Sequence, residues 1–133
     1  MENAAQDPAT RLHLRLFFAH GAMLGPGKAE LLEHIRDTGS ISAAGRAMDM
    51  SYKRAWMLVD AMNAAFAAPL VESARGGAGG GGAQVTEAGL EVLRLYRALQ
   101  DTAARAGAVE IAAITAMLRD IPDGNAESSD LRP

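Results

Sequence analysis

The segment SISAAGRAMDMSYKRAW, residues 40–56, contains two apolar stretches with helical spacing that are connected by a short joint of about four residues. Ser40 and Ser51 are predicted to cap the two helices, because a serine hydroxyl accepts hydrogen bonds from the free amides of a first turn. Asp49 lies at the joint and tolerates the left-handed backbone that a tight corner requires. Gly45 permits a very close approach of the helices. The segment therefore predicts two short, closely packed helices.

The second of these helices has two different faces. Its predicted buried stripe has spacings of three and four residues and consists of Ala55, Val59, Met62 and Phe66. Lys53, Met57 and Asp60 fall on the opposite side, flanked by Arg54 and Trp56. The cationic side chains are thus expected to face away from the core.

The rest of the chain supplies the other elements of one small domain. TRLHLRLFF, residues 10–18, alternates and predicts a half-buried strand. A helix is predicted from Lys28 to a stop at Gly39, and two strands at 70–73 and 83–86 around a glycine-rich tip. A long helix is predicted from Thr86, with a bend or a break at Gly107 and the apolar stripe Val92, Leu95, Tyr96, Leu99 and Ala103.

Three helices followed by a hairpin and a long helix predict a mainly α fold with a small β-hairpin, a winged helix-turn-helix. The stripe on the long helix exceeds what so small a domain needs to cover itself, which favours a homodimer through residues of about 86–119 over packing within one chain. The predicted boundaries are a domain at 1–119 and an acidic, unfolded tail at 120–133.

Charge and composition limit the function classes. The net charge is −3, and residues 120–133 account for all of it, with four acidic residues against one arginine. The remainder is neutral, so the local field decides which partners bind. The chain has no cysteine, no apolar run of about 18 residues and no secretion signal. We therefore expect a cytoplasmic protein without a membrane partner.

Two segments resemble a known family. GSISAAGRAMDMSYKRAWMLVDAMN and LVESARGGAGGGGAQVTEAG are similar to the DNA-binding domain of the ModE family, the bacterial molybdate-responsive transcriptional regulators. The most specific parts are SISAA, SYKxAW, MN and the glycine-rich wing, and the resemblance covers roughly residues 12–99. GSISAA is also similar to LysR-type regulators.

The resemblance implies DNA binding, a dimer through the strand and long helix, and target genes concerned with molybdate uptake or molybdenum enzymes. Full-length family members carry a C-terminal molybdate-binding region of small β-barrels. Its ligands carry over to no residue of this sequence, so molybdate binding by this chain is not expected. We expect no other cofactor.

The predicted DNA-binding residues begin at the start of the second helix. Lys53 and Arg54 can reach guanine O6 and N7 or a phosphate, because the major groove displays a distinct pattern for each base pair. Ser51 and Tyr52 offer hydroxyls to phosphate near free helix amides. The competing interpretation is an ordinary solvated helix surface.

Three further side chains have two interpretations each. Met57 either meets a thymine methyl or packs against a neighbouring loop. Arg46 either contacts a phosphate or forms a salt bridge with Asp49 or Asp60. Trp56 is expected to be half-buried and structural rather than to contact a base.

The predicted wing, ARGGAGGGGA, completes the DNA-binding set. Arg75 at its base is expected to contact a phosphate or the minor groove, and Gly79 and Gly80 let the tip approach a backbone without a Cβ in the way. The wing lacks the GK[ST] ending of a P-loop, so nucleotide binding is not predicted.

Nothing in the sequence predicts catalysis. No histidine lies in a nucleophile motif, and His13, His20 and His34 do not share metal-ligand spacing. We therefore expect neither an enzyme nor a metal site. The predicted function is a homodimeric transcriptional regulator that reads a pseudo-palindromic operator. The alternative is a protein-interaction module of winged-helix fold that acts through a full-length regulator or another protein.

Overall fold

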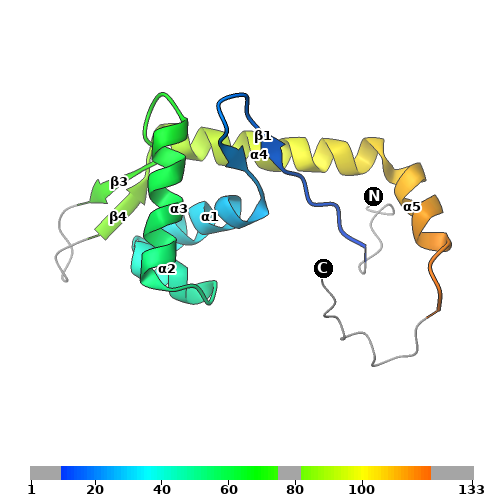
Figure 1. Ribbon diagram of the computed structural model, residues 1–133, viewed down its shortest axis with the longest axis horizontal. Helices are drawn as coiled ribbons and strands as arrows, with labels where there is room; N and C mark the ends of the chain where they lie inside the picture. The colour runs from blue at the N-terminus through cyan, green and yellow to red at the C-terminus, as the bar shows by residue number, and fades with distance from the viewer. Residues whose placement is uncertain (1–9, 75–81, 121–133) are drawn as a thin grey trace. The chain divides into compact units, whose positions relative to one another are not determined.

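A computed structural model describes residues 10–74 and 82–120 of the chain. The chain divides into two compact units, Leu12–Thr102 and a second made of the two chain ends, Met1–Arg11 and Ala103–Pro133. The described residues form nine elements: β1 Leu16–Phe17, β2 Met23–Leu24, α1 Pro26–Thr38, α2 Ile41–Ala47, α3 Tyr52–Ala65, β3 Val71–Ala74, β4 Gly82–Val85, α4 Glu87–Ala106 and α5 Ala108–Ala116. Figure 1 shows the course of the chain through them. The predicted winged helix-turn-helix architecture is confirmed.

The ends of α1, α2 and α3 follow the sequence. Ser40 Oγ accepts a hydrogen bond from Ala43 N at 3.0 Å, and Ser51 Oγ accepts one from Arg54 N at 3.0 Å. Gly39 ends α1 with a φ of 72°, and Asp49 turns the joint with a φ of 58°. Both positive φ values favour the residue types found there. The predicted caps and corner are confirmed.

The core of the Leu12–Thr102 unit lies between the helix-turn-helix, the base of the hairpin and α4. Its fully buried large side chains are Leu31, Leu32, Ile35, Val59, Met62, Leu70 and Tyr96. Helices α2 and α3 approach closely at Gly45, where an added Cβ would lie 3.0 Å from the Cβ of Ala55. The two helices therefore form one rigid corner.

The N-terminal segment corrects one prediction. In place of a strand over residues 10–18, the structure has the two-residue strand β1, which pairs with β2, a strand that the sequence did not predict. Within this unit, Tyr96 Oη donates to Leu14 O at 2.7 Å and Gln100 Nε2 donates to Leu12 O at 3.0 Å. Helix side chains therefore bind these carbonyls in place of a neighbouring strand.

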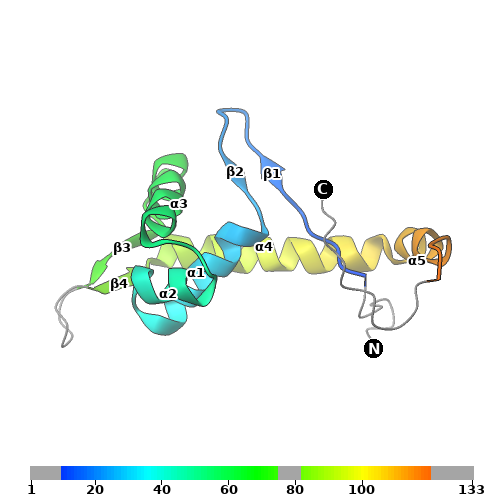
Figure 2. The ribbon, with the colours of Figure 1, turned by 60° about the horizontal axis from the view of Figure 1, so that its bottom comes forward.

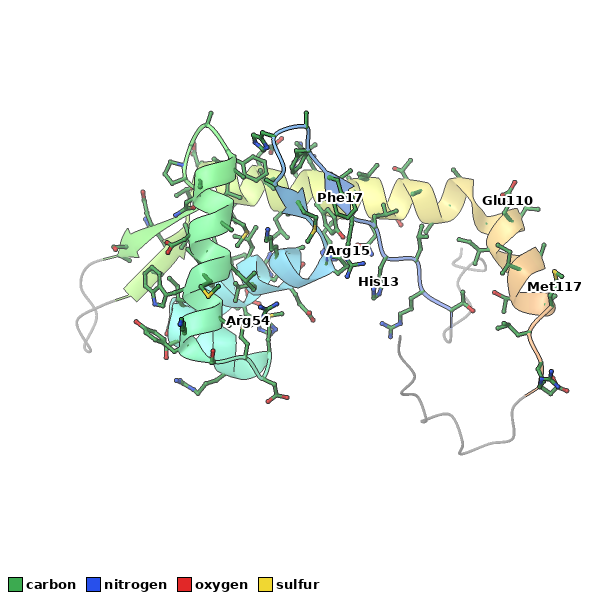
Figure 3. All side chains as sticks on the ribbon, viewed as in Figure 1. His13, Arg15, Phe17, Arg54, Glu110 and Met117 are labelled. Carbon is green, nitrogen blue, oxygen red and sulfur yellow. The ribbon has the colours of Figure 1, made fainter. Side chains whose placement is uncertain are left out.

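The alternation of burial in this segment is nevertheless as expected. Leu12, Leu14, Leu16 and Phe18 are partly buried, whereas His13, Arg15 and Phe17 are exposed. Figure 3 labels these three side chains on the N-terminal segment. The turn after β1 contacts the end of α3, because the Phe18 and Phe66 rings are 5.9 Å apart in an edge-to-face arrangement.

Helix α4 divides its predicted stripe between two faces. Tyr96 and Leu93 are buried and Val92 is partly buried; the predicted stripe did not include Leu93. Leu95 and Leu99 are 51% and 40% exposed. The stripe is therefore not a single core-facing surface.

Two contacts fix the start and middle of α4. At Gly89 an added Cβ would overlap the carbonyl oxygen of Leu70, so the helix begins directly against the base of the hairpin. Arg97 Nη2 lies 2.8 Å from Glu33 Oε1 on α1. This hydrogen-bonded arginine lowers the pKa of the Glu33 carboxyl. Figure 2 shows α1 beside the first part of α4.

The second unit contains the end of α4 and α5. The helix breaks at Gly107 between Ala106 and Ala108, as predicted. Thr10 Oγ1 lies 3.2 Å from Thr115 Oγ1 within this unit. No side chain of α5 is buried in the part of the chain that the structure describes, and Val109 and Met117 are 77% and 84% exposed.

Candidate nucleic-acid interface

The first turns of α3 present a cationic surface. Ser51, Tyr52, Lys53 and Arg54 are all exposed, whereas Ala55 in the next position is fully buried. Figure 3 shows Arg54 on the part of α3 that follows α2. The packing of Ala55, Val59 and Met62 into the core orients this surface, because those residues fix the rotation of the helix about its axis.

The side chains of Lys53 and Arg54 are not committed to other groups in the part of the chain that the structure describes. Within residues 10–74 and 82–120, neither side chain forms an ion pair or a hydrogen bond. A cation that is already paired loses that interaction when it binds a phosphate. These two groups are therefore available to an anionic partner.

The aromatic and apolar residues of α3 extend this surface. The rings of Tyr52 and Trp56 lie edge to face at 6.3 Å between centroids. Trp56 is 37% exposed, which agrees with the expected half-buried position. Met57 is 56% exposed, so most of its side chain is not packed against a loop of this chain.

Arg46 on α2 does not form the salt bridge that the sequence left open. Its Nη1 donates to Ser42 Oγ at 3.0 Å, one turn earlier on the same helix. No ion pair links Arg46 to Asp49 or Asp60 in the described part of the chain. A neutral hydroxyl does not compensate the arginine charge, so the charge remains available to an anionic partner.

The base of the wing is well defined. Strands β3 and β4 pair antiparallel, from Val71 opposite Val85 to Ala74 opposite Gly82. Ala83 N donates to Gly39 O at 3.0 Å, which ties β4 to the corner between α1 and α2. The predicted contacts Arg75, Gly79 and Gly80 lie outside the described residues.

A cleft of about 470 Å³ separates α3 from the hairpin. From the helix it is lined by Tyr52, Trp56, Val59 and Asn63, and from the hairpin by residues that include Ser73 and Gly82. Asn63 belongs to the MN motif that resembles the ModE family, but no role for it was predicted from the sequence. Its partners are backbone atoms after α3, which no spacing rule within a helix can identify.

Neither a metal site nor a membrane-spanning helix is found in the described residues. They contain no cluster of three or more histidine, cysteine or acidic residues that could hold a metal ion. None of the helices in residues 10–74 and 82–120 is both long enough and apolar enough to cross a membrane.

Comparison with known families assigns the fold. Residues 27–90 match the family described as bacterial regulatory helix-turn-helix protein, lysR family. This match covers α1, α2, α3, the hairpin and the start of α4. Residues 27–90 are therefore similar to a LysR-type helix-turn-helix domain.

Individual relatives of this LysR-type domain agree with the resemblance seen in the sequence. The chain is 49% identical over 80 residues to the molybdenum-pterin-binding protein MopB of Rhodobacter capsulatus, covering 60% of this chain and 30% of the relative. It is 41% identical over 80 residues to the molybdenum transport protein ModE of Azotobacter vinelandii, with the same coverage.

A third relative carries DNA binding in its name. The chain is 44% identical over 71 residues to the DNA-binding transcriptional dual regulator ModE of Escherichia coli (strain K12), covering 53% of this chain and 27% of the relative. The chain thus spans less than a third of the length of each of these curated relatives. The resemblance to the DNA-binding domain of the ModE family is confirmed.

Proposed function

We propose that the chain is a homodimeric, sequence-specific DNA-binding transcriptional regulator that reads a pseudo-palindromic operator. The observation that carries this proposal is that Lys53 and Arg54 on the first turns of α3 are exposed and form no ion pair with any residue that the structure describes. In helix-turn-helix proteins this part of the second helix enters the major groove. The LysR-type domain at residues 27–90 supports the same function.

The proposed roles follow from the chemistry of each side chain. Arg54 and Lys53 bind guanine edges or nearby phosphates, with the arginine fork able to form two parallel hydrogen bonds. Ser51 and Tyr52 contact phosphate, and Met57 contacts a thymine methyl. Arg46 on α2 contacts the DNA backbone, which the first helix of such motifs crosses.

The wing supplies a second set of proposed contacts. Arg75 binds a phosphate or the minor groove, and the glycines at positions 79 and 80 allow close approach to the backbone. These assignments rest on the sequence and on the position of β3 and β4 beside α3.

The proposed dimer forms through α4. Leu95 and Leu99 lie one helical turn apart and remain about half-exposed, although both belong to an amphipathic helix. A second copy of the helix packed against them would remove this apolar surface from water. A two-fold dimer would place two α3 helices about one DNA turn, roughly 34–36 Å, apart or a multiple of it.

The proposed targets are genes of molybdenum metabolism or transport. The support is the similarity to proteins named for molybdenum transport and molybdenum-pterin binding. Those proteins are about three times longer than the matched segment. We assign no molybdate ligand to this chain. We place the regulator in the cytoplasm, in contact with the chromosome, and propose no catalytic activity for it.

A salt-dependent gel-shift assay tests the function. We expect the purified chain to retard duplex DNA from its own upstream region, with affinity falling steeply as salt rises, because each neutralised phosphate releases counterions. Failure to bind that duplex even at low salt, together with capture of a full-length regulator, would contradict the proposal. It would instead favour a protein-interaction module of the same fold.

A further inference from the structure

We propose that Asn63 is a positioning residue that holds the β3–β4 hairpin at a fixed distance from α3, so that helix and hairpin contact one duplex together. The inference rests on the proposed DNA-binding function and adds a residue that does not itself contact DNA. Asn63 lies in the last turns of α3, distant in sequence from the basic residues at the start of that helix.

The amide of Asn63 binds the start of β3 with three hydrogen bonds. Its Oδ1 accepts from Leu70 N at 2.8 Å and from Val71 N at 3.1 Å, and its Nδ2 donates to Val71 O at 3.0 Å. Both the N–H and the C=O of Val71 are therefore occupied by one side chain. The amide acts as a neighbouring strand would act at this edge of β3.

This arrangement admits a single orientation of the amide. Two backbone donors and one backbone acceptor surround it, so the oxygen and nitrogen cannot be exchanged without placing like groups together. Leu70 and Val71 are 0% and 3% exposed, and water cannot readily replace the lost bonds. Each buried backbone group left without a partner would cost about 1–3 kcal/mol.

The position of Asn63 relates these bonds to DNA binding. Trp56, Val59 and Asn63 follow one another at spacings of three and four, so they share the side of α3 that lines the cleft facing the hairpin. Tyr52 lines the same cleft at the start of the helix, beside the proposed DNA contacts. Asn63 closes the opposite end. The amide therefore determines how far the hairpin stands from the start of α3.

The other strand has its own attachment. Ala83 N donates to Gly39 O, which ties β4 to the corner between α1 and α2. Without the Asn63 bonds, this attachment would remain while β3 lost its link to α3. We therefore expect the hairpin to pivot about β4 rather than to unfold.

A distance measurement between two spin labels tests the pivot without DNA. The chain has no native cysteine, so Asp60→Cys and Glu72→Cys place single labels on exposed positions of α3 and β3, the strand that is expected to move. Labelled chains are diluted with unlabelled ones to isolate distances within one chain. We expect one narrow distance distribution in the parent and a clearly broader one after Asn63→Ala. An unchanged distribution would overturn the proposal.

A DNA-binding comparison tests the consequence. Asn63→Ala is expected to weaken binding to the selected operator at least 10-fold. The matched control is Leu24→Ala, which removes a buried side chain of β2, outside both α3 and the hairpin. If Asn63→Ala weakens binding no more than this control does at equal residual stability, Asn63 is merely structural and the proposal fails.

Asn63→Asp provides a second variant for the case that Asn63→Ala does not fold. A carboxylate keeps both accepted bonds but cannot donate to Val71 O, so we expect intermediate broadening and an intermediate loss of affinity. Behaviour identical to the parent in both measurements would contradict the proposal. If the parent does not bind duplex DNA, the proposed function is wrong. The distances between the labels then still test whether Asn63 holds the hairpin in place.

Discussion

In the proposed function, single side chains at the start of α3 determine DNA binding. Lys53 and Arg54 carry charges that no described residue compensates, and Ala55 beside them is buried. Arg46 adds a third cation that is bonded to a neutral hydroxyl. The chain is acidic as a whole, so binding to DNA depends on where these few charges lie rather than on their sum.

Replacing Lys53 and Arg54 together with alanine is expected to abolish sequence preference and to leave the dimer intact. Each base contact of this kind is worth about 1–3 kcal/mol of discrimination. Competition gel shifts with specific and random duplexes measure the preference, and light scattering measures the mass. Arg36→Ala with Arg119→Ala removes the same charge elsewhere and should keep the preference. Monomers with unchanged DNA affinity would show that α3 faces the partner chain.

A second residue-scale prediction concerns Tyr96. Its ring is 2% exposed and its hydroxyl donates to Leu14 O at 2.7 Å. Tyr96→Phe keeps the packing and removes that bond, leaving a carbonyl without its partner, so the free energy of unfolding should fall by about 1 kcal/mol. Urea unfolding measures the change. A variant as stable as the parent would mean that water replaces the hydroxyl.

Among the helices and strands, the features that the sequence predicted correctly are those that depend on neighbouring residues. The caps at Ser40 and Ser51, the corner at Asp49 and the break at Gly107 were predictable, because each depends on a few neighbouring residues. The exposed face of α3 was predictable for the same reason, since its rotation follows from Ala55, Val59 and Met62.

Features that depend on distant partners were not predictable. The predicted long strand became β1 alone, because Tyr96 and Gln100 of α4 bind its carbonyls. The stripe of α4 was assigned to one face, although Leu93 is buried and Leu95 is not. Asn63 had no assigned role, because its partners lie beyond the helix that carries it.

The link between α1 and α4 yields a prediction about pH. Hydrogen bonds from Arg97 lower the pKa of Glu33, so this carboxylate stabilises the fold above its unfolded pKa of about 4.3. That contribution is lost as the pH falls through the lower, folded value. The Glu33–Arg97 pair is partly exposed, so its contribution to the free energy of unfolding is about 1 kcal/mol or less.

Comparing the parent with Glu33→Gln isolates this term from other carboxylates. Urea unfolding should show the parent more stable by up to about 1 kcal/mol at pH 7. The difference should shrink as the pH is lowered below about 4, where Glu33 becomes protonated. A difference that is constant with pH would contradict the assignment to the ionised pair.

Reading a pseudo-palindromic operator, as proposed for the whole molecule, requires two copies of the chain. Leu95 and Leu99 are the exposed leucines through which we propose that α4 pairs. Leu95→Glu with Leu99→Glu places charges in that surface and should convert the dimer to a folded monomer. Light scattering gives the mass and circular dichroism the helix content. Dimers that persist would exclude this face of α4.

Hydroxyl-radical footprinting of the unaltered chain on its selected operator tests whether two paired copies of α3 read DNA. We expect two symmetric protected regions whose centres are about 10–10.5 base pairs, or a multiple of that, apart. Both should disappear when Lys53 and Arg54 are replaced. A single protected region, or the same two regions in the replaced protein, would contradict a paired scaffold that reads DNA through α3.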